Sequence, residues 1–386
     1  MIIDFNISRT DFVKYYQGKK PLLIKKAFEV TQAFTWTDAN QIIERSSVES
    51  DDFKILHNGL VPKSEYVETF YDVGMIRHRL IKSAVYERMK SGATLIANKI
   101  VNEPKVHAFA RQVAQFTGRQ TVSSAYAAFG RQASFQTHWD TRDIFSIQLI
   151  GRKRWFIYEP SFSDPLYMQQ SKDLEHDYPC PAEPCMDFVL EPGDVLYLPR
   201  GWWHNPLPFE EETFHLSIGT FPAVVLDYVQ WSMQQQLPAL LTARKSMSTF
   251  EDDRENLTQL ASQFAGMVLD PTHYGRFMEA FDTAQRVGAP LAIDLLGNSG
   301  IKQLPDDTGL QLSANSTLSI AQNYLIANGT RVNLDEQALL LVRSIEHSPG
   351  IRLDELLTLL PEMDPAKVRA LVFELCHQDT LELIRP

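Results

Sequence analysis

Three side chains that commonly bind metal ions lie in two short segments of this chain, and both segments have β-strand character. His138 and Asp140 are two residues apart and come shortly before the apolar run FSIQLIG (145–151). The second segment, 190–206, predicts a Pro-Gly-Asp turn, an apolar strand and then His204. In a strand, residues i and i+2 point to the same face, so the first pair can bind one ion together. We therefore expect all three side chains to converge inside a β-structure.

Two imidazoles and one carboxylate form the facial triad that holds non-haem Fe(II) in oxygenases, with open positions for a cosubstrate and O2. A His-X-Asp pair alone is a weak signal, because such pairs also occur on surface strands. Here the pair is followed by the basic stretch GRKRW (151–155) and by PGDVLYLPRGWWH (192–204). This combination predicts an iron site at His138, Asp140 and His204, although zinc, nickel or manganese could occupy the same ligands.

The chain changes character near residues 121 and 222. Between these points, short β-rich runs alternate with turns, which is typical of an antiparallel barrel or sandwich. The preceding part mixes short strands and helices. There the sequence predicts a strand over 21–28 and helices over 35–46, 75–90 and 104–117, the first of them beginning at Thr37 or Asp38.

The last part of the chain is predicted to be mainly helical. Apolar spacing favours helices over 223–287, which either pack on the barrel or form a dimer, and we favour a homodimer. A hairpin is predicted at 316–334, with two short strands around Gln322-Asn323 and a second turn at Asn328-Gly329. Three helices and a short strand then follow in the manner of a winged helix. We therefore divide the chain into domains 1–222, 223–290 and 291–386.

The acidic balance of the chain argues against a nucleic-acid-binding protein. The formal net charge is −11 over 386 residues, and 331–386 hold ten acidic against six basic residues. Phosphate binding needs the opposite balance, so we expect no direct DNA binding by the winged-helix-like end. An acidic surface permits a basic partner, although solubility alone would explain the charge more simply.

Nothing in the sequence predicts export or membrane insertion. The N-terminus MIIDFNISRTDF has no basic region before an apolar run, and no stretch approaches the ~18 uninterrupted apolar residues of a membrane helix. Three cysteines do not suggest a disulfide framework, so we expect a cytoplasmic protein. Cys180 and Cys185 share the loop CPAEPC, but a zinc site there would lack a second cysteine pair.

The order HWD, FSIQLIGRKRWFIYEP and EPGDVLYLPRGWWH resembles the JmjC-type 2-oxoglutarate oxygenases, most closely the ribosomal oxygenases, which hydroxylate ribosomal proteins. The helical segment, the hairpin LSIAQNYLIANG and the winged-helix-like end also match that branch. The likeness covers most of the chain and is most specific over 135–220. It implies a mainly β fold with α, in which a double-stranded β-helix (cupin) barrel precedes the helical segment and the winged-helix-like domain. It further implies Fe(II), 2-oxoglutarate and O2.

The resemblance also implies that 2-oxoglutarate chelates the iron and that a basic residue pairs with its far carboxylate. Arg152, Lys153 and Arg154 are the candidates. Strand alternation separates Lys153 from the two arginines, and the family pattern places the basic residue at Lys153. For the arginines, a solvated surface position is the simpler interpretation. Ser217 matches the small polar residue that the family places against the cosubstrate.

Several neighbouring residues have two interpretations each. His215 is more simply a buried histidine than a fourth ligand, and Asn205 a turn residue rather than a partner of His204. The tryptophans near the motif line either a substrate opening or the core. Arg142 and Asp143 could contact a basic substrate. The insert 161–187 either covers the site or forms part of the surface away from it. The tryptophans are Trp139, Trp202 and Trp203.

The resulting hypothesis is a protein hydroxylase that depends on Fe(II) and 2-oxoglutarate. The resemblance points to an arginine or histidine side chain of a basic ribosomal protein as its substrate. The alternatives are a JmjC oxygenase or demethylase acting on another protein, an oxygenase acting on a small molecule, and a non-catalytic cupin that serves as a binding protein. The complete triad and Lys153 weigh against the non-catalytic alternative.

Overall fold

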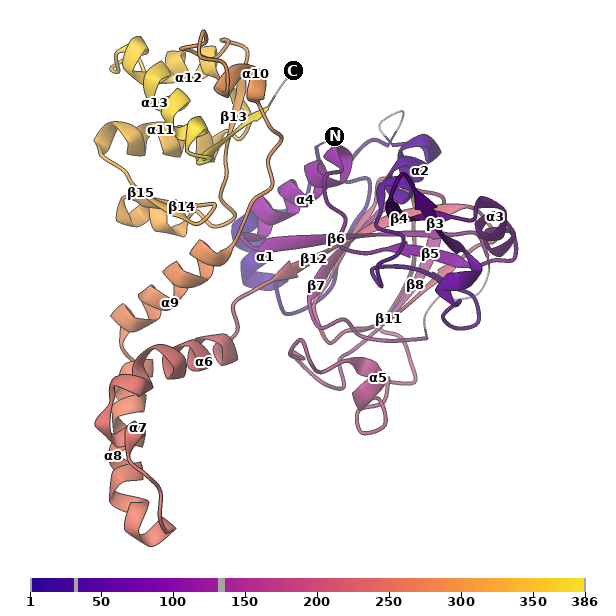
Figure 1. Cartoon of the computed structure of the whole chain (residues 1–386), viewed down its shortest axis with the longest axis horizontal. Helices are drawn as coiled ribbons and strands as arrows, with labels where there is room; N and C mark the ends of the chain where they lie inside the picture. The colour runs from indigo at the N-terminus through magenta and orange to yellow at the C-terminus, as the bar shows by residue number, and fades with distance from the viewer. Residues whose placement is uncertain (1, 31–33, 131–135, 385–386) are drawn as a thin grey trace. The chain divides into compact units, whose positions relative to one another are not determined.

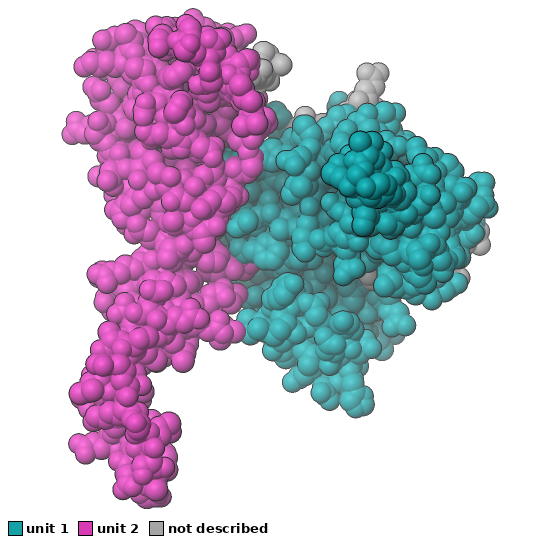
Figure 2. Space-filling view, in the orientation of Figure 1, with its two compact units in different colours: residues 1–221 teal, residues 222–386 magenta. Residues whose placement is uncertain are grey.

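The computed structural model describes residues 2–30, 34–130 and 136–384. The chain divides into two compact units, residues 1–221 and 222–386 (Figures 1 and 2). Each unit has its own hydrophobic core. The sequence predicts a boundary near residue 222 and a further one near 290, and this second boundary stays a prediction.

Unit 1 is built on two antiparallel sheets. The larger sheet has the strand order β1-β10-β7-β12-β6-β5-β2, and the smaller has the order β11-β8-β9. The predicted β-rich region is therefore confirmed. The strands are β1 (Leu22–Ile24), β2 (Phe53–Leu56), β5 (Thr94–Ala97), β6 (Gln120–Ala128), β7 (Asp143–Ile150), β8 (Lys153–Tyr158), β9 (Met186–Leu190), β10 (Val195–Leu198), β11 (Trp203–Pro208) and β12 (Thr213–Phe221).

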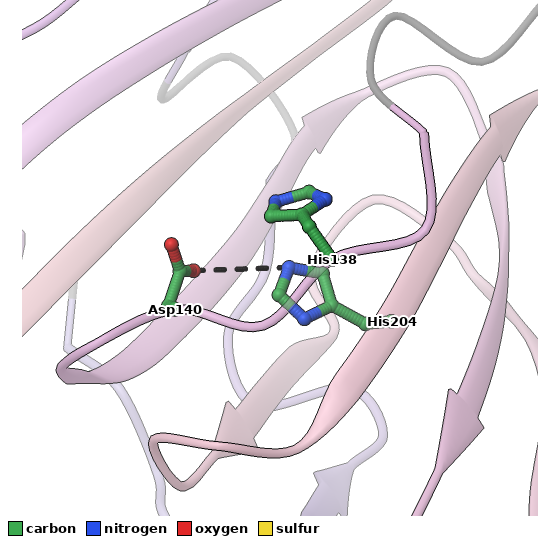
Figure 3. Close-up of side chains that lie close together, drawn as sticks. All are labelled: His138, Asp140 and His204. Atoms are coloured by element: carbon green, nitrogen blue, oxygen red, sulfur yellow. Dashed lines mark ion pairs between the residues drawn. The ribbon is translucent and has the colours of Figure 1, made fainter. Parts of the chain in front are cut away.

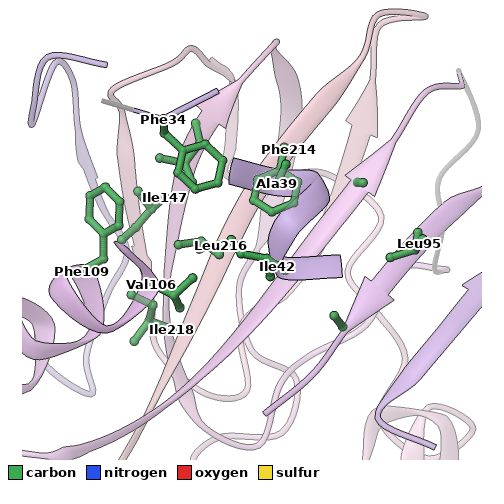
Figure 4. Close-up of a cluster of buried hydrophobic side chains, with 14 of the residues drawn as sticks. Phe34, Ala39, Ile42, Leu95, Val106, Phe109, Ile147, Phe214, Leu216 and Ile218 are labelled. Carbon is green, nitrogen blue, oxygen red and sulfur yellow. The ribbon is translucent and has the colours of Figure 1, made fainter. Parts of the chain in front are cut away.

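One face of the larger sheet carries the main core of unit 1. Phe214, Leu216 and Ile218 alternate along β12 and pack against helices α2 (Trp36–Arg45) and α4 (Pro104–Thr117), as Figure 4 shows. Helix α4 has the predicted bounds, because Pro104 begins it and Gly118, in the left-handed region at φ 70°, ends it. Because successive side chains of a strand point to opposite faces, His215 and Ser217 point to the other face of the sheet.

The opposite face of the larger sheet meets the smaller sheet. Ile144 and Leu196 of the larger sheet share one buried cluster with Trp155 and Ile157 of β8. The space between the two sheets is therefore an interior lined by both, as in a closed β-barrel. Lys153 lies on the same face of β8 as Trp155 and is also buried.

Three predictions for the first 120 residues need correction. Helix α2 is capped by Thr35, with Asp38 completing a capping box at its third position. The predicted strand 21–28 ends at Ile24, shortly before Lys26 takes a φ of 52°. The predicted helix 75–90 is half strand. A turn at Val73-Gly74, with both φ positive, makes a hairpin of β3 (Val67–Asp72) and β4 (Met75–Leu80), and α3 (Lys82–Lys90) follows. Helix α1 (Arg9–Tyr15) lies near the N-terminus.

Unit 2 begins with the predicted helices. The longest of them, α8 (Phe250–Val268), has no buried residue although it is 19 residues long. None of the described helices is long and apolar enough to cross a membrane. The other helices of this part are α6 (Val225–Gln236), α7 (Leu241–Arg244), α9 (Pro271–Ala284) and α10 (Ile293–Leu296).

The end of the chain has the predicted three helices and final strand. These are α11 (Glu336–His347), α12 (Leu353–Leu359), α13 (Pro365–His377) and β17 (Leu381–Ile384), which pairs with β13 (Gly309–Leu312) beside β16 (Ile351–Arg352). The hairpin needs correction. Leu318–Gln322 is a 3-10 turn rather than a strand, and the hairpin joins β14 (Tyr324–Ala327) to β15 (Thr330–Asn333) through Asn328-Gly329.

Candidate metal centre

The side chains of His138, Asp140 and His204 come together in unit 1. One potential ligand atom from each lies within 4.8 Å of the others, and Figure 3 shows the three side chains grouped together. His204 Nε2 and Asp140 Oδ2 are 3.7 Å apart. In the described part of the chain, no other group of three or more His, Cys, Asp or Glu side chains has its ligand atoms this close together. No such group therefore forms around Cys180 and Cys185 there.

The backbone explains this convergence differently from the sequence prediction. His138 and Asp140 do not share a regular strand, because Asp140 lies in the loop that leads into β7. His138 instead forms an isolated antiparallel bridge with His204. The His204 N–H donates to the His138 carbonyl at 2.8 Å, and the His138 N–H donates back at 3.2 Å. Two backbone hydrogen bonds therefore connect the first and third candidate ligands directly.

Both imidazoles have a fixed orientation. Nδ1 of His138 lies 2.8 Å from the Gln136 carbonyl, and Nδ1 of His204 lies 3.1 Å from the Trp202 carbonyl. A carbonyl oxygen can only accept, so Nδ1 carries the proton in each ring and Nε2 keeps its lone pair. Burial, with a smaller effect from His138, lowers the pKa of His204 to about 4. The His204 ring is therefore neutral near pH 7, as a metal ligand must be.

Asp143 fastens the loop before His204 to the start of β7. Its carboxylate is 1% exposed and accepts hydrogen bonds from the Arg119 guanidinium at 2.7 Å, the Tyr197 hydroxyl at 2.8 Å and the Arg200 N–H at 3.0 Å. The prediction that Asp143 contacts a substrate is therefore wrong. Its contacts are internal, and they hold the segment that presents His204.

Asp143→Asn should lower both stability and metal affinity. Without the carboxylate charge, the Arg119 guanidinium loses its partner, which should cost about 2–3 kcal/mol of unfolding free energy. Because the loop before His204 is held less firmly, zinc affinity should fall about tenfold. The measurements are urea unfolding and zinc titration. Asp187→Asn is the matched control, since the Asp187–Arg154 pair is exposed. Equal unfolding curves for the two variants would contradict this role of Asp143.

Lys153 and its two arginine neighbours lie in different environments. Lys153 is 3% exposed, and its Nζ is 3.1 Å from His215 Nδ1. Burial lowers the pKa of Lys153 to about 7. Arg152 and Arg154 are exposed and pair with surface carboxylates. Strand alternation thus separates one interior ammonium from two surface cations. Nδ1 of His215 points to Lys153, and His215 does not belong to the group of candidate metal ligands His138, Asp140 and His204.

The barrel interior also holds buried polar atoms without partners. Ser217 faces Ser124 on β6 and Ser146 on β7, so three hydroxyls form one row across the larger sheet. Within the described residues, Ser146 Oγ and Trp155 Nε1 have no hydrogen-bond partner. Unpaired buried donors are costly, so they fit a space that takes a polar ligand. Ser124 and Ser146 could not be predicted from local sequence, because strand pairing between distant segments brings them beside Ser217.

The tryptophans next to the candidate ligands anchor the insert 161–187. Trp139 and Trp203 are fully buried and pack edge to face, with ring centroids 4.5 Å apart. Trp139 Nε1 donates to the Gln169 carbonyl at 3.0 Å, and Trp203 Nε1 donates to Ser161 Oγ at 2.9 Å. These two tryptophans are therefore core residues. The insert, which contains α5 (Ser171–Leu174), is attached directly to the segments that carry His138, Asp140 and His204.

Residues 95–228 match the family model described as the JmjC domain. The chain contains a JmjC domain. Its whole length is also similar to the X-ray structure of E. coli ycfD, with 16% identity, a TM-score of 0.59 and full coverage of both chains. A structure of E. coli YcfD in complex with cobalt and 2-oxoglutarate gives 15% identity and a TM-score of 0.57, covering 99% of this chain and 100% of that one. These likenesses confirm the predicted fold class.

Curated relatives of the JmjC domain match a shorter stretch. Ribosomal oxygenase 1 of Danio rerio is 39% identical over 107 residues, which are 27% of this chain and 19% of the relative. The bifunctional lysine-specific demethylase and histidyl-hydroxylase NO66 of Drosophila yakuba is 37% identical over 101 residues, 26% of this chain and 14% of the relative. The chain thus matches a fifth or less of the length of these two proteins.

Proposed function

We propose that this protein is a hydroxylase that depends on Fe(II) and 2-oxoglutarate and that acts on a side chain of a ribosomal protein. The observation that carries the proposal is the convergence of two imidazoles and one carboxylate within the segment that matches the JmjC domain. His138 Nε2, His204 Nε2 and an oxygen of Asp140 would hold the iron. This donor set suits Fe(II) and leaves positions open for 2-oxoglutarate and O2.

The interior of the barrel supports the cosubstrate part of the proposal. Lys153 would pair with the far carboxylate of 2-oxoglutarate, and Ser217 would lie beside it. The buried ammonium without an acidic partner among the described residues, and the unpartnered Ser146 and Trp155 donors, fit an anionic ligand. Trp155 also lies against His204, with ring centroids 5.8 Å apart and planes at 24°. It would hold that ring in place and keep water away.

When bound, iron with 2-oxoglutarate and O2 supplies an oxidant for an unreactive C–H bond. The chain's own residues do the rest. They hold the iron in one geometry, orient the cosubstrate through Lys153 and place the target side chain close to the open position. The names of the relatives, ribosomal oxygenase and histidyl-hydroxylase, support a ribosomal protein and a histidine side chain as the target, and arginine is the alternative that the family resemblance implies. Such a substrate agrees with a cytoplasmic location.

The direct test is turnover with ribosomal proteins as substrate. The purified protein with Fe(II) and O2 should convert 2-oxoglutarate to succinate, and His138→Ala should not. Ribosomal proteins from cells without the gene should lack one added oxygen atom that cells with the gene show by mass spectrometry. Absence of succinate would overturn the oxygenase, leaving a binding protein. Succinate without any mass difference in the ribosome would overturn the ribosomal substrate and favour another protein or a small molecule.

The insert 161–187 supports a basic substrate. It holds six acidic residues against one lysine, and it is anchored beside the candidate metal ligands through Trp139 and Trp203. Asp164 and Asp187 pair with arginines, whereas Asp173, Glu175 and Asp177 are exposed. A negative surface next to the site would attract an arginine-rich segment and orient it on approach.

Removing insert charges should weaken substrate binding without slowing the chemistry. For the double variant Asp173→Asn/Glu175→Gln, KM for the ribosomal protein should rise about threefold or more, most clearly at low salt, because long-range attraction is lost. kcat should stay unchanged. The control, Glu336→Gln/Glu362→Gln, removes two charges from unit 2 and should leave KM unchanged. An equal rise in KM in both double variants would mean that only the overall charge of the protein affects substrate binding.

We also propose that the protein is a homodimer formed through the helical part of unit 2. Helix α8 has no buried residue, and Leu241, Phe250 and Leu269 are exposed on these helices. Exposed apolar side chains that gather on one part of a protein mark an interaction surface more often than isolated ones do.

Light scattering should therefore give twice the mass of one chain. Phe250→Asp should shift the protein toward monomer, because a carboxylate in an apolar interface is strongly unfavourable. Leu318→Asp, at an exposed position outside the helical part, is the control and should leave the mass unchanged. A monomeric wild-type protein at micromolar concentration would refute the dimer.

A further inference from the structure

The Lys153 ammonium has an unusual partner. It lies inside the barrel, where its hydrogen bond within the described residues goes to His215 Nδ1 at 3.1 Å. Lys153 comes from β8 of the smaller sheet and His215 from β12 of the larger sheet, and both are buried. A buried ammonium normally pairs with a carboxylate. Here a histidine takes that place, so the ammonium keeps its charge available for another anion.

The direction of this hydrogen bond follows from the chemistry of the two groups. A charged ammonium can only donate, so His215 Nδ1 accepts and its proton is on Nε2. Burial lowers the pKa of His215 well below its usual value, with a further contribution from Lys153, so the ring stays neutral. A neutral acceptor stabilises the ammonium without neutralising it. The Lys153 ammonium is thereby held against His215 of the larger sheet.

The His215 ring is itself held firmly. It stacks on Tyr126 with centroids 4.8 Å apart and planes at 7°, and it meets Trp155 edge to face at 6.1 Å. The pairing of β12 with β7 shifts register between Phe214 and His215. The extra residue of this irregularity is Leu149 on β7, so His215 keeps the regular alternation of β12. Tyr126 of β6 and Trp155 of β8 therefore hold the ring whose Nδ1 meets the ammonium.

We propose that His215 is a positioning residue that holds the Lys153 ammonium with one N–H and leaves the other two N–H groups for the far carboxylate of 2-oxoglutarate. This inference rests on the proposed function. It assigns to His215 a role other than metal binding. Without the acceptor, Lys153 would lose its proton more readily or leave its position, and the anion would bind more weakly.

Lys153 is the group that changes charge in the relevant pH range. Tyr126, from β6, stays neutral because burial raises its pKa far above neutral. His204, on β11 beyond Trp155, is neutral there as well, and Gln148, opposite His215 on β7, does not titrate. The affinity for 2-oxoglutarate should therefore fall on the alkaline side as Lys153 is deprotonated, and this fall should move to lower pH when His215 is removed.

The test is calorimetric titration of 2-oxoglutarate into the Fe(II)-loaded protein without O2, across pH 6 to 9. His215→Phe keeps a ring but removes the acceptor, so Kd should rise about tenfold, as expected for an unsatisfied buried donor. His215→Gln restores an acceptor and should bring Kd back to within about threefold of wild type. In turnover, KM for 2-oxoglutarate should rise in His215→Phe, whereas kcat at saturation should not change. His273→Phe, at a buried histidine of unit 2, is the control.

If His215→Phe does not fold, His215→Asn replaces it, because the shorter amide does not reach the ammonium and should give the same loss. Wild-type affinity and an unshifted pH profile in these variants would overturn the role of His215 and leave the proposed function intact. An equal loss in His215→Gln and His215→Phe would also overturn it, since packing alone would then explain the effect. A wild-type protein that binds no 2-oxoglutarate would instead refute the proposed function.

Discussion

Asp140→Ala is expected to abolish Fe(II)-dependent turnover of 2-oxoglutarate and to weaken divalent metal binding by about a hundredfold or more. Asp140 supplies the one carboxylate of the candidate site, and its removal leaves the imidazoles of His138 and His204. The remaining pair provides only two ligands and no charge compensation for a divalent ion. Metal affinity is measured by competition with a chelating dye, and turnover by succinate release.

The variant Asp164→Ala controls for the loss of a carboxylate in the same unit. Asp164 lies on the insert and pairs with Arg200 at the surface, so its removal should change metal affinity by less than about twofold. Folding of both variants is checked by thermal unfolding. Wild-type turnover in Asp140→Ala would show that the three side chains converge for a structural reason and that the iron site lies elsewhere.

Lys153→Ala is expected to weaken 2-oxoglutarate binding by about a hundredfold, because the ligand carboxylate would enter a buried site without its counter-charge. The wild-type protein should also take up a proton on binding. The pKa of Lys153 is about 7 in the empty site, and the carboxylate of the ligand raises it. Well below pH 7 the lysine is charged in both states, so no proton is taken up. Above pH 7 the uptake approaches one proton, and affinity falls as pH rises.

Calorimetry in buffers of different ionisation enthalpy measures this uptake. Lys153→Ala should show none and should lose the pH dependence above pH 7. Arg154→Ala, on the outward face of the same strand, is the matched control and should bind 2-oxoglutarate like wild type, with the same uptake. Unchanged affinity in Lys153→Ala would place the far carboxylate somewhere else in the barrel.

The parts of the site that depend on local sequence could be predicted. The residue types of the triad and their order suggested a shared metal, and strand alternation placed Lys153 apart from Arg152 and Arg154. Helix α4 was predicted with its observed bounds from the helical spacing of its apolar residues, and in the structure Pro104 and Gly118 mark its two ends. The fold class followed from the family resemblance and is confirmed by the likeness to solved structures.

The parts that depend on long-range pairing could not be predicted. The bridge between His138 and His204 joins residues 66 positions apart, and no local pattern encodes it. The burial of Asp143 requires Arg119, Tyr197 and Arg200 to meet at one point, which only the folded chain reveals. The row of Ser124, Ser217 and Ser146 has the same origin, because three separate strands must align in register.

The backbone bridge between His138 and His204 has a consequence for how the protein acquires its metal. Because main-chain hydrogen bonds already join the two ligand-bearing segments, loading an ion requires little conformational work. Folding and metallation are then separate events, unlike in zinc fingers, whose chain is disordered until the ion arrives. Two imidazoles and one carboxylate bind most divalent first-row ions, so the donor types alone do not select one of them. The ion found in the protein would thus depend on cellular supply more than on the barrel itself.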